Sequence, residues 1–213
     1  MVDICKEKAI IFRITHLDNV PWILENGLHC KTSDTRDDNF RTIGNPELID
    51  KRRSKNIPEH PGGTLSDYVP FYFTPYSMML YNIKTGWMGL KQFPMSEISI
   101  IISSLHKVAE DGLDFLFTDR HALVFNARFS GDLKNLNWVD WNAIASRNFK
   151  KKTAEDLERC ERYQAEALVH RHMPVSSILG IAFHGETQKA RIAREIERLS
   201  IPLKLVTKPD WYF

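Results

Sequence analysis

The chain has 213 residues, of which 43% are hydrophobic and 26% are charged, and its formal net charge is +2. This is the composition of an ordinary soluble globular domain, and the length suffices for one well-buried core but is short for two. It excludes a membrane-spanning protein, because no apolar run approaches the roughly 18 residues that a membrane helix needs. We therefore expect a single domain over residues 1–213, and the net charge is too small to identify a partner.

The N-terminus and the cysteines indicate the cellular compartment. Residues 1–8 are too charged for the apolar core of a secretion signal. The three cysteines, Cys5, Cys30 and Cys160, are odd in number, far apart and without a Cys-x-x-Cys pair. They predict free thiols in a reducing compartment, and hence a cytoplasmic protein, rather than a disulfide framework or a zinc site.

The first third of the chain contains strand and helix patterns separated by polar or Gly/Pro-rich segments. The expected elements are a strand over Ala9–Thr15, a helix that is capped by Asp18 or Asn19 and ends at Gly27, a polar loop over residues 30–45, and a helix from Pro46 to about Lys55. The segment Tyr68–Phe73 is strongly β-prone. Pro70 has no N–H to donate, so we expect an edge strand or an irregular strand there.

The remainder of the chain mixes short strands with helices. The expected elements are a helix at Met78–Tyr81, strands at Ile98–Ile102 and Phe115–Phe117, a segment capped by Asp119 through Phe125, a helix over Trp138–Arg147, strands at Tyr163–Val169 and Gly180–Phe183, an amphipathic helix near Gln188–Leu199, and a strand at Leu203–Thr207. No regular βαβ alternation is visible. The sequence therefore predicts an α+β fold with a largely antiparallel sheet.

Glu166 is the most informative residue of the chain. The apolar residues Ala165, Ala167 and Val169 alternate with Gln164, Glu166 and Leu168, which is the period of a strand. An ionised glutamate among such neighbours needs a partner, a ligand or a shifted pKa, and such carboxylates are candidate catalytic groups. The alternative interpretation is a glutamate on the exposed face of a strand.

Two basic clusters suit single-stranded nucleic acid. One is Lys51–Lys55, and the other is Arg147–Lys152, which contains Phe149. Phosphates need cations and bases need aromatic stacking surfaces, so Arg147, Lys150, Lys151 and Lys152 are our candidate DNA-binding residues. The alternative for each cluster is a solvated helix face. His170 and His172 could share a strand face and bind a metal, but no third ligand is evident, so we expect no metal.

None of the familiar signatures of nucleotide or metal enzymes is present, and the patterns above do not identify a reaction. Seven separated segments nevertheless form a recognisable set: Phe12–Asn19, Lys51–Arg53, Pro61–Gly63, Asp67–Pro75, Phe117–His121, Gln164–Val169 and Asp210–Phe213. In this order and at this spacing, over essentially the whole chain, they resemble the DarT family of DNA ADP-ribosyltransferase toxins. Seven matches in register make this resemblance specific.

The resemblance implies an ADP-ribosyltransferase-like α+β fold, in which two small, mostly antiparallel β-sheets form a cleft around NAD and helices pack outside. It implies NAD-dependent, sequence-dependent transfer of ADP-ribose to N3 of thymidine bases in single-stranded DNA. It also implies a bacterial toxin–antitoxin pair, in which a DarG-like macrodomain antitoxin removes the modification.

The resemblance also assigns roles to individual residues. Glu166 matches the catalytic glutamate of the family, and Arg52 matches its second essential site residue. The residues expected to bind NAD are Arg13, Thr15, His16, Arg52, Tyr72 and His121. Arg13 is a departure, because family members often carry His there. The segment over residues 145–165 corresponds to the loop that reads the acceptor.

Three alternatives remain open at this point. The acceptor could be another base, RNA or a protein side chain. The chain could be a non-enzymatic nucleic-acid-binding module that uses its basic clusters. It could also hydrolyse NAD with water as the only acceptor.

Overall fold

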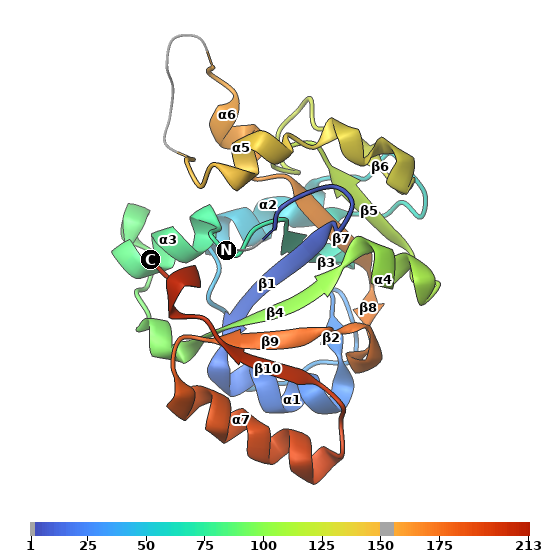
Figure 1. Cartoon of the computed structure of the whole chain (residues 1–213). Helices are drawn as coiled ribbons and strands as arrows, with labels where there is room; N and C mark the ends of the chain where they lie inside the picture. The colour runs from blue at the N-terminus through green and yellow to red at the C-terminus, as the bar shows by residue number, and fades with distance from the viewer. Residues whose placement is uncertain (1–2, 150–155) are drawn as a thin grey trace.

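One mixed β-sheet with helices packed around it organises the chain (Figure 1). The computed structural model describes residues 3–149 and 156–213. The strands are β1 (Ile10–His16), β2 (Leu28–His29), β3 (Tyr68–Tyr72), β4 (Ile98–Ser104), β5 (Phe115–Thr118), β6 (Phe129–Ser130), β7 (Glu166–His170), β8 (His172–Met173), β9 (Gly180–Phe183) and β10 (Lys204–Thr207). The helices are α1 (Val20–Asn26), α2 (Pro46–Ser54), α3 (Met78–Thr85), α4 (Leu105–Glu110), α5 (Trp141–Ala145), α6 (Arg159–Tyr163) and α7 (Glu186–Leu199).

The main sheet has the strand order β10-β9-β4-β1-β3-β7-β5-β6, and β2 pairs with β8 in a separate two-stranded sheet. The expected α+β class is therefore confirmed, but the expected pair of small sheets is wrong. The two halves of the main sheet are joined where Phe12 of β1 pairs with Tyr72 of β3. This pair joins the two groups of strands into one continuous sheet.

Neighbouring strands of the main sheet are antiparallel, as expected, with the exception of β9 and β10. These two strands are parallel, and the connection between them contains α7. A parallel pair needs such a crossover connection, which a hairpin cannot supply. The predicted sequence of strand, amphipathic helix and strand at this end of the chain is thus a βαβ unit.

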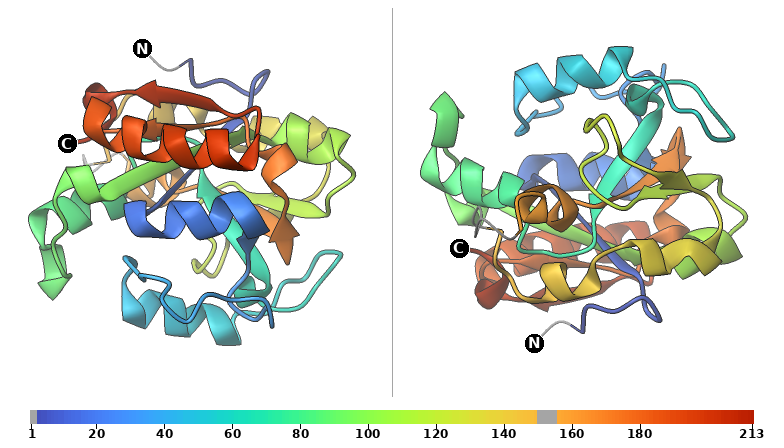
Figure 2. Two further views of the ribbon diagram at one scale, coloured as in Figure 1. Left: turned by 90° about the horizontal axis from the view of Figure 1, so that it is seen from below. Right: turned by 90° about the horizontal axis from the view of Figure 1, so that it is seen from above.

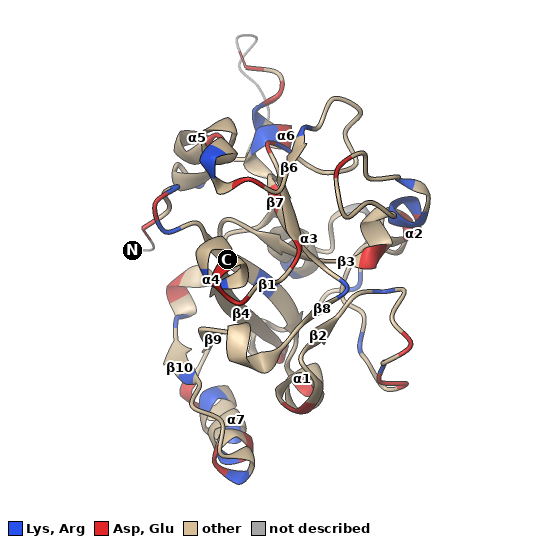
Figure 3. Cartoon of the chain, turned by 90° about the vertical axis from the view of Figure 1, so that its right-hand side faces the viewer, with Lys and Arg blue, Asp and Glu red and all other residues tan. Residues whose placement is uncertain are grey.

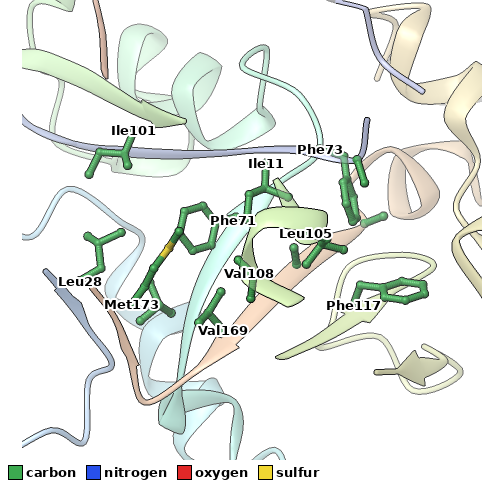
Figure 4. Close-up of a cluster of buried hydrophobic side chains, with 14 of the residues drawn as sticks. Ile11, Leu28, Phe71, Phe73, Ile101, Leu105, Val108, Phe117, Val169 and Met173 are labelled. Carbon is green, nitrogen blue, oxygen red and sulfur yellow. The ribbon is translucent and has the colours of Figure 1, made fainter. Parts of the chain in front are cut away.

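The largest core lies beside β1, β3 and β7. Figure 4 shows Ile11, Phe71 and Val169 from these strands gathered with side chains of α4 and β8. Each of these three side chains is completely buried. A core of this size contributes the main favourable free energy of folding, and it holds in place the three strands from which the site below is built.

Both faces of the main sheet are covered. On one side, Ile192 of α7 packs with Val20 and Leu24 of α1 and with Ile181 of β9, and the two helices lie side by side in Figure 2. On the other side, a second cluster joins strands of the sheet to α3 and to the C-terminal Trp211 and Tyr212. Strands buried on both faces carry apolar residues at consecutive positions, as at positions 10–12 of β1 and 100–102 of β4.

The elements predicted in the first third of the chain are confirmed with small shifts. Gly27 ends α1 with a φ of 79°, and Asn45 caps α2 by accepting hydrogen bonds from two backbone N–H groups. The cap predicted for α1 is wrong, because the Asp18 carboxylate pairs with Arg41 and Arg191 and Asn19 makes no such bond. Its side-chain amide donates instead to Thr15 Oγ1 and to the Arg41 carbonyl, and its oxygen accepts from the Arg41 N–H.

The strand of Pro70 is not an edge strand, but it is irregular, as the alternative expectation had it. β3 is an interior strand, paired with β7 from Tyr68 to Tyr72. Towards β1, however, its pairing consists of the contact between Phe12 and Tyr72 in the described part of the chain. Since Pro70 has no N–H, it cannot extend the ladder with β1, and the strands separate there.

The other discrepancies lie after β3 in the chain. The predicted strand over Tyr163–Val169 begins later, because α6 continues to Tyr163 and β7 starts at Glu166. Asp119 caps no helix, since its carboxylate accepts from the backbone and side chain of Arg128. The predicted helix over Trp138–Arg147 is reduced to α5, which starts at the Asp140 cap, and α3 is longer than expected.

Candidate active site

The site begins where β1 and β3 separate. Arg13, which follows the paired Phe12, places its guanidinium in this opening, and its Nη1 donates to the carbonyl oxygen of Pro70 at 2.8 Å. The Arg13 guanidinium thus binds a carbonyl that would accept from a backbone N–H of β1 if the two strands remained paired. The opening exposes the ends of β1, β3 and β7 to a common cavity, which Arg13, Tyr72 and Glu166 help to line.

Glu166 occupies the first position of β7, opposite Tyr72 of β3. Its side chain is only 4% exposed, which rules out the alternative of a glutamate on an exposed strand face. Oε2 accepts from Arg52 Nη1 at 2.8 Å, and Oε1 accepts from the backbone N–H of Ala122 at 3.0 Å. Both carboxylate oxygens are therefore bound, as a buried carboxylate requires.

These partners keep Glu166 ionised. Burial alone would raise the pKa of its carboxyl group, because the charged form loses hydration. The positive charge of Arg52 is the largest opposing influence, followed by His121 and the Ala122 N–H, and together they hold the pKa below the ordinary value of 4.5. The site consequently presents a dehydrated negative charge at neutral pH.

Two guanidinium groups face the same cavity with hydrogen-bonding capacity to spare. Within the described residues, Nε of Arg13 and Nη2 of Arg52 are buried and lack a hydrogen-bond partner. Burial, together with the nearby charge of Arg52, lowers the pKa of Arg13 to about 10. A buried N–H without a partner costs roughly 1–3 kcal/mol, so an anionic ligand between these groups would be strongly favoured.

Two adjoining cavities meet at these arginines. One has a volume of about 210 Å³ and contains Glu166, and the other has a volume of about 410 Å³ and extends towards α1 and the loop over residues 30–45. Their combined size lies within the roughly 300–1,000 Å³ that small-molecule sites occupy. The residues that line both are Arg13, Phe40, Thr42, Ile49, Arg52 and Pro70.

Tyr72 and His121, both expected beside the cofactor, line the smaller cavity. The Tyr72 hydroxyl points at Met79 Sδ at 3.8 Å, and burial followed by the charge of Glu166 raises the pKa of this phenol. The His121 ring accepts a hydrogen bond from the Leu123 N–H at Nδ1. The structure thus brings these two side chains together with Glu166, Arg52 and Arg13.

Thr15 and His16 are placed differently from one another. Thr15 lines the smaller cavity, and its buried hydroxyl accepts from Asn19. The His16 ring is 1% exposed and does not line either cavity. Its Nδ1 accepts from the Asp18 N–H, and its Nε2 lies 3.1 Å from Glu97 Oε2. The ring therefore fixes the turn after β1, and its assignment to the cofactor stays a prediction.

The candidate DNA-binding residues are only partly described. Lys150, Lys151 and Lys152 lie outside the described residues. Arg147 is exposed, and its guanidinium lies 3.7 Å from the centroid of the Tyr76 ring. Tyr76 precedes α3, whose Met78, Met79 and Asn82 line the smaller cavity. Arg147 therefore lies near the α3 side of the site.

Some groups that build the site were missed by the sequence analysis. The Ala122 N–H is the clearest case, because a backbone donor leaves no signal in side-chain chemistry. Gln164 and Leu123 also line the cavity that contains Glu166. Gln164 lies two residues before Glu166, within the recognised segment Gln164–Val169. This position in the sequence was the one indication that Gln164 belongs to the site.

Three further observations limit the chemistry. In residues 3–149 and 156–213, no group of three His, Cys, Asp or Glu side chains is placed to hold a metal ion. Cys5, Cys30 and Cys160 form no disulfide with one another, as expected. Over the same residues, no helix combines the length and the apolar character needed to cross a membrane.

Comparison with known proteins identifies the family. A family profile described as "ssDNA thymidine ADP-ribosyltransferase, DarT" matches residues 12–213. The chain belongs to the DarT family. It is accordingly a thymidine ADP-ribosyltransferase that acts on single-stranded DNA.

Individual relatives agree with this membership. A DNA ADP-ribosyl transferase of Escherichia coli O127:H6 is 43% identical over 207 residues, which is 97% of this chain and 94% of that protein. The structure of Thermus sp. 2.9 DarT in complex with ADP-ribosylated ssDNA superposes with a TM-score of 0.89 at 31% identity and covers 100% of both chains. The same protein in complex with NAD+ gives a TM-score of 0.85 at 32% identity and covers 97% of this chain and 98% of that chain.

A more distant DarT relative has an additional part. A protein of Thermosipho africanus is described as a DNA ADP-ribosyl transferase–DNA ADP-ribosyl glycohydrolase fusion protein. It is 24% identical over 206 residues, which is 95% of this chain and 49% of that protein.

The buried pair of Glu166 and Arg52 predicts how stability depends on pH. Because the pKa of Glu166 in the folded protein lies below 4.5, the ionised form stabilises the fold above that pH, and this contribution is lost as the pH falls through the folded value. Glu166→Gln keeps one acceptor oxygen but turns an NH2 group towards the second donor. We expect it to cost about 1–3 kcal/mol at pH 7, with a smaller cost towards about pH 3.5.

Urea unfolding of both proteins across this pH range measures the difference. Glu197→Gln, on the exposed face of α7, is the matched control and should stay within about 0.5 kcal/mol of the parent at every pH. A cost that does not change with pH would show that the pKa of Glu166 is the same in the folded and unfolded protein, and a cost that grows as the pH falls would show that Glu166 is neutral in the folded protein.

Proposed function

We propose that the chain transfers ADP-ribose from NAD+ to N3 of a thymine base, with Glu166 as the catalytic carboxylate and Arg52 as its charged partner. The observation that carries this proposal is a buried ionised carboxylate in a cavity that adjoins a second one across two guanidinium groups. A dinucleotide has two nucleoside halves joined by a diphosphate, and this arrangement offers a place for each part.

The charged groups support this placement of NAD+. The buried N–H groups of Arg13 and Arg52 that lack a partner are suited to the diphosphate oxygens, because guanidinium forms charge-assisted hydrogen bonds with phosphate. The smaller cavity, with Glu166, then receives the nicotinamide riboside half, and Thr15, Tyr72 and His121 line the same space. The larger cavity receives the adenosine half, beside Trp22, Phe40 and Tyr68.

Glu166 acts on the positive charge that develops on the ribose. As the bond from ribose C1′ to the nicotinamide nitrogen breaks, nicotinamide leaves with the bonding electrons, and C1′ becomes cationic. A fixed carboxylate in a water-poor site stabilises this charge in the transition state more than in the ground state. Arg52 and the Ala122 N–H hold the carboxylate in place, so little reorganisation is needed during the reaction.

The same carboxylate is the candidate acceptor of the thymine proton. The N3 lone pair forms the new bond to C1′, which makes the N3–H much more acidic as the bond forms. Glu166 has a low pKa and is a weak base, so it takes the proton only at this stage. The products are nicotinamide and a thymine that carries ADP-ribose on N3.

The strand of DNA and the antitoxin complete the proposal. Arg147 lies beside the α3 side of the site, so we assign it and the adjoining Lys150, Lys151 and Lys152 to the acceptor strand, which the family reads in a sequence-dependent manner. The fusion of a transferase with a glycohydrolase in a Thermosipho relative supports a DarG-like macrodomain antitoxin as the partner of this chain. We place both in the bacterial cytoplasm, as the number and spacing of the cysteines in the sequence suggested.

Glu166→Gln tests the catalytic assignment. We expect at least about a 100-fold loss of ADP-ribose transfer, because the amide carries no charge to stabilise the transition state, while NAD+ still binds. Mass spectrometry of a thymidine-containing single-stranded oligonucleotide after incubation with NAD+ measures the product, and calorimetry measures NAD+ binding. Glu197→Gln is the control, with unchanged transfer.

Full transfer by Glu166→Gln would remove this residue from the chemistry. RNA and protein acceptors incubated in parallel with labelled NAD+ test the alternative substrates. Nicotinamide release without any modified acceptor would support NAD+ hydrolysis alone.

Arg13→Met tests the diphosphate assignment. The substitution keeps an unbranched apolar stem but removes the charge and the donors, so the Michaelis constant for NAD+ should rise by roughly tenfold or more. The Michaelis constant for the oligonucleotide should stay unchanged, and thermal unfolding checks that the fold is retained. An unchanged constant for NAD+ would place the diphosphate elsewhere.

A further inference from the structure

Phe125 is the most exposed large hydrophobic side chain in the described part of the chain. Its side chain is 98% exposed, compared with 63% for Leu157 and 60% for Trp87. A single apolar residue on a surface needs no explanation by itself. This one, however, lies at the tip of the loop over residues 119–128, which reaches the catalytic carboxylate, and the mechanism above makes no use of it.

The loop that carries Phe125 is fixed on both sides of its tip. On one side, the Ala122 N–H donates to Glu166, and Leu123 lines the cavity that contains this carboxylate. On the other side, the backbone and the side chain of Arg128 both donate to Asp119 at 3.0 Å. Phe125 is thus held two residues from the cavity wall, on a turn whose base cannot shift without disturbing Glu166.

The surroundings of the loop are cationic. Ala122, Leu123 and Ala127 pack with Ile57, just beyond the end of α2, in one apolar cluster. Figure 3 marks lysine and arginine positions along α2, and the last turn of this helix and the residue after it include Lys51, Arg53 and Lys55. Lys51 and Arg53 pair with Glu47 and Asp50, but all four side chains are more than half exposed. Such exposed pairs are weak, so phosphates can replace the carboxylates.

The geometry points to Phe125 as a substrate-positioning residue, on which a nucleobase next to the target thymidine stacks while phosphates of the strand meet the end of α2. This inference rests on the proposed function, because it takes single-stranded DNA as the acceptor. A protein surface is a less suitable occupant, since an isolated ring beside cations offers it little apolar area. Every base has a π-face, so the contact would hold the strand without selecting the stacked base.

The path of the strand supports this assignment. In Figures 1 and 2, the loop over residues 119–128 and α3 lie on different sides of the start of β7, where Glu166 is located. Arg147 lies on the α3 side through its contact with Tyr76. A DNA strand held by Phe125 at one side and by Arg147 at the other passes over the Glu166 carboxylate.

Removal of the Phe125 ring should weaken binding of the oligonucleotide and leave binding of NAD+ unchanged. We expect Phe125→Ala to raise the Michaelis constant for the oligonucleotide by about tenfold or more, as loss of one stacked base implies. The constant for NAD+ should not change, and Phe125→Tyr should restore the parent value. Leu179→Ala, which removes another exposed apolar side chain away from the cavities, is the control without effect.

A base-removal experiment identifies the stacked nucleotide. Oligonucleotides with a single abasic position, moved one step at a time around the target thymidine, are compared in the parent and in Phe125→Ala. At the stacked position, removal of the base should raise the Michaelis constant of the parent for the oligonucleotide. It should change that of Phe125→Ala little further, because the contact is already missing. Equal losses in both proteins at every position would overturn the proposal.

A fluorescence measurement separates this inference from the proposed function. Phe125→Trp reports stacking directly, since a base on the indole should quench its emission when a single-stranded oligonucleotide is added, whether or not transfer occurs. Quenching without any modified DNA would defeat the proposed function alone. Unchanged emission, together with unchanged constants for Phe125→Ala, would overturn the stacking role and favour a protein partner at this loop.

Discussion

The structure depends on one buried ion pair at the point where its sheet opens. Glu166 and Arg52 come from elements separated by more than half of the chain, and their 2.8 Å contact joins β7 to α2. α2 has no fully buried residue, so its packing against the rest of the molecule is limited, and the pair is a main reason for its position. A buried pair of this kind contributes little net stability, because dehydration of both charges opposes their attraction. Its value lies in placing an ionised carboxylate where water is scarce.

The opening itself has a local cause in the backbone. Pro70 cannot donate to β1, and Arg13 inserts its guanidinium where the ladder would continue. The two strands therefore separate where the positive charge lies, and Arg13 and Arg52 line the resulting cavity. Burial and, after it, repulsion by the charge of Arg52 lower the pKa of Arg13. Local strain of this kind is acceptable at a site that spends part of its cycle with a charged ligand.

The sequence predicted the individual residues better than their arrangement. The buried glutamate, the capped α2 and the strand of Pro70 could be read from side-chain patterns, because burial, caps and missing N–H groups each have a residue signature. The sheet could not, since the pairing of Phe12 with Tyr72 decides between one sheet and two and depends on register. The start of β7 was missed because Tyr163 and Gln164 fit both a strand and the last turn of α6. The Ala122 donor and the exposed tip at Phe125 required coordinates.

The most direct test of this account is the ionisation of Glu166 itself. Carbon-13 labelling of glutamate side chains, with Glu166→Gln to assign the signal, allows the carboxyl shift to be followed as the pH is lowered. The account predicts that Glu166 titrates below 4.5, despite its burial, and that Arg52→Met raises the value. A Glu166 carboxyl group that is already protonated at neutral pH would contradict the account, because a neutral acid could neither bind Arg52 as described nor stabilise a cationic ribose.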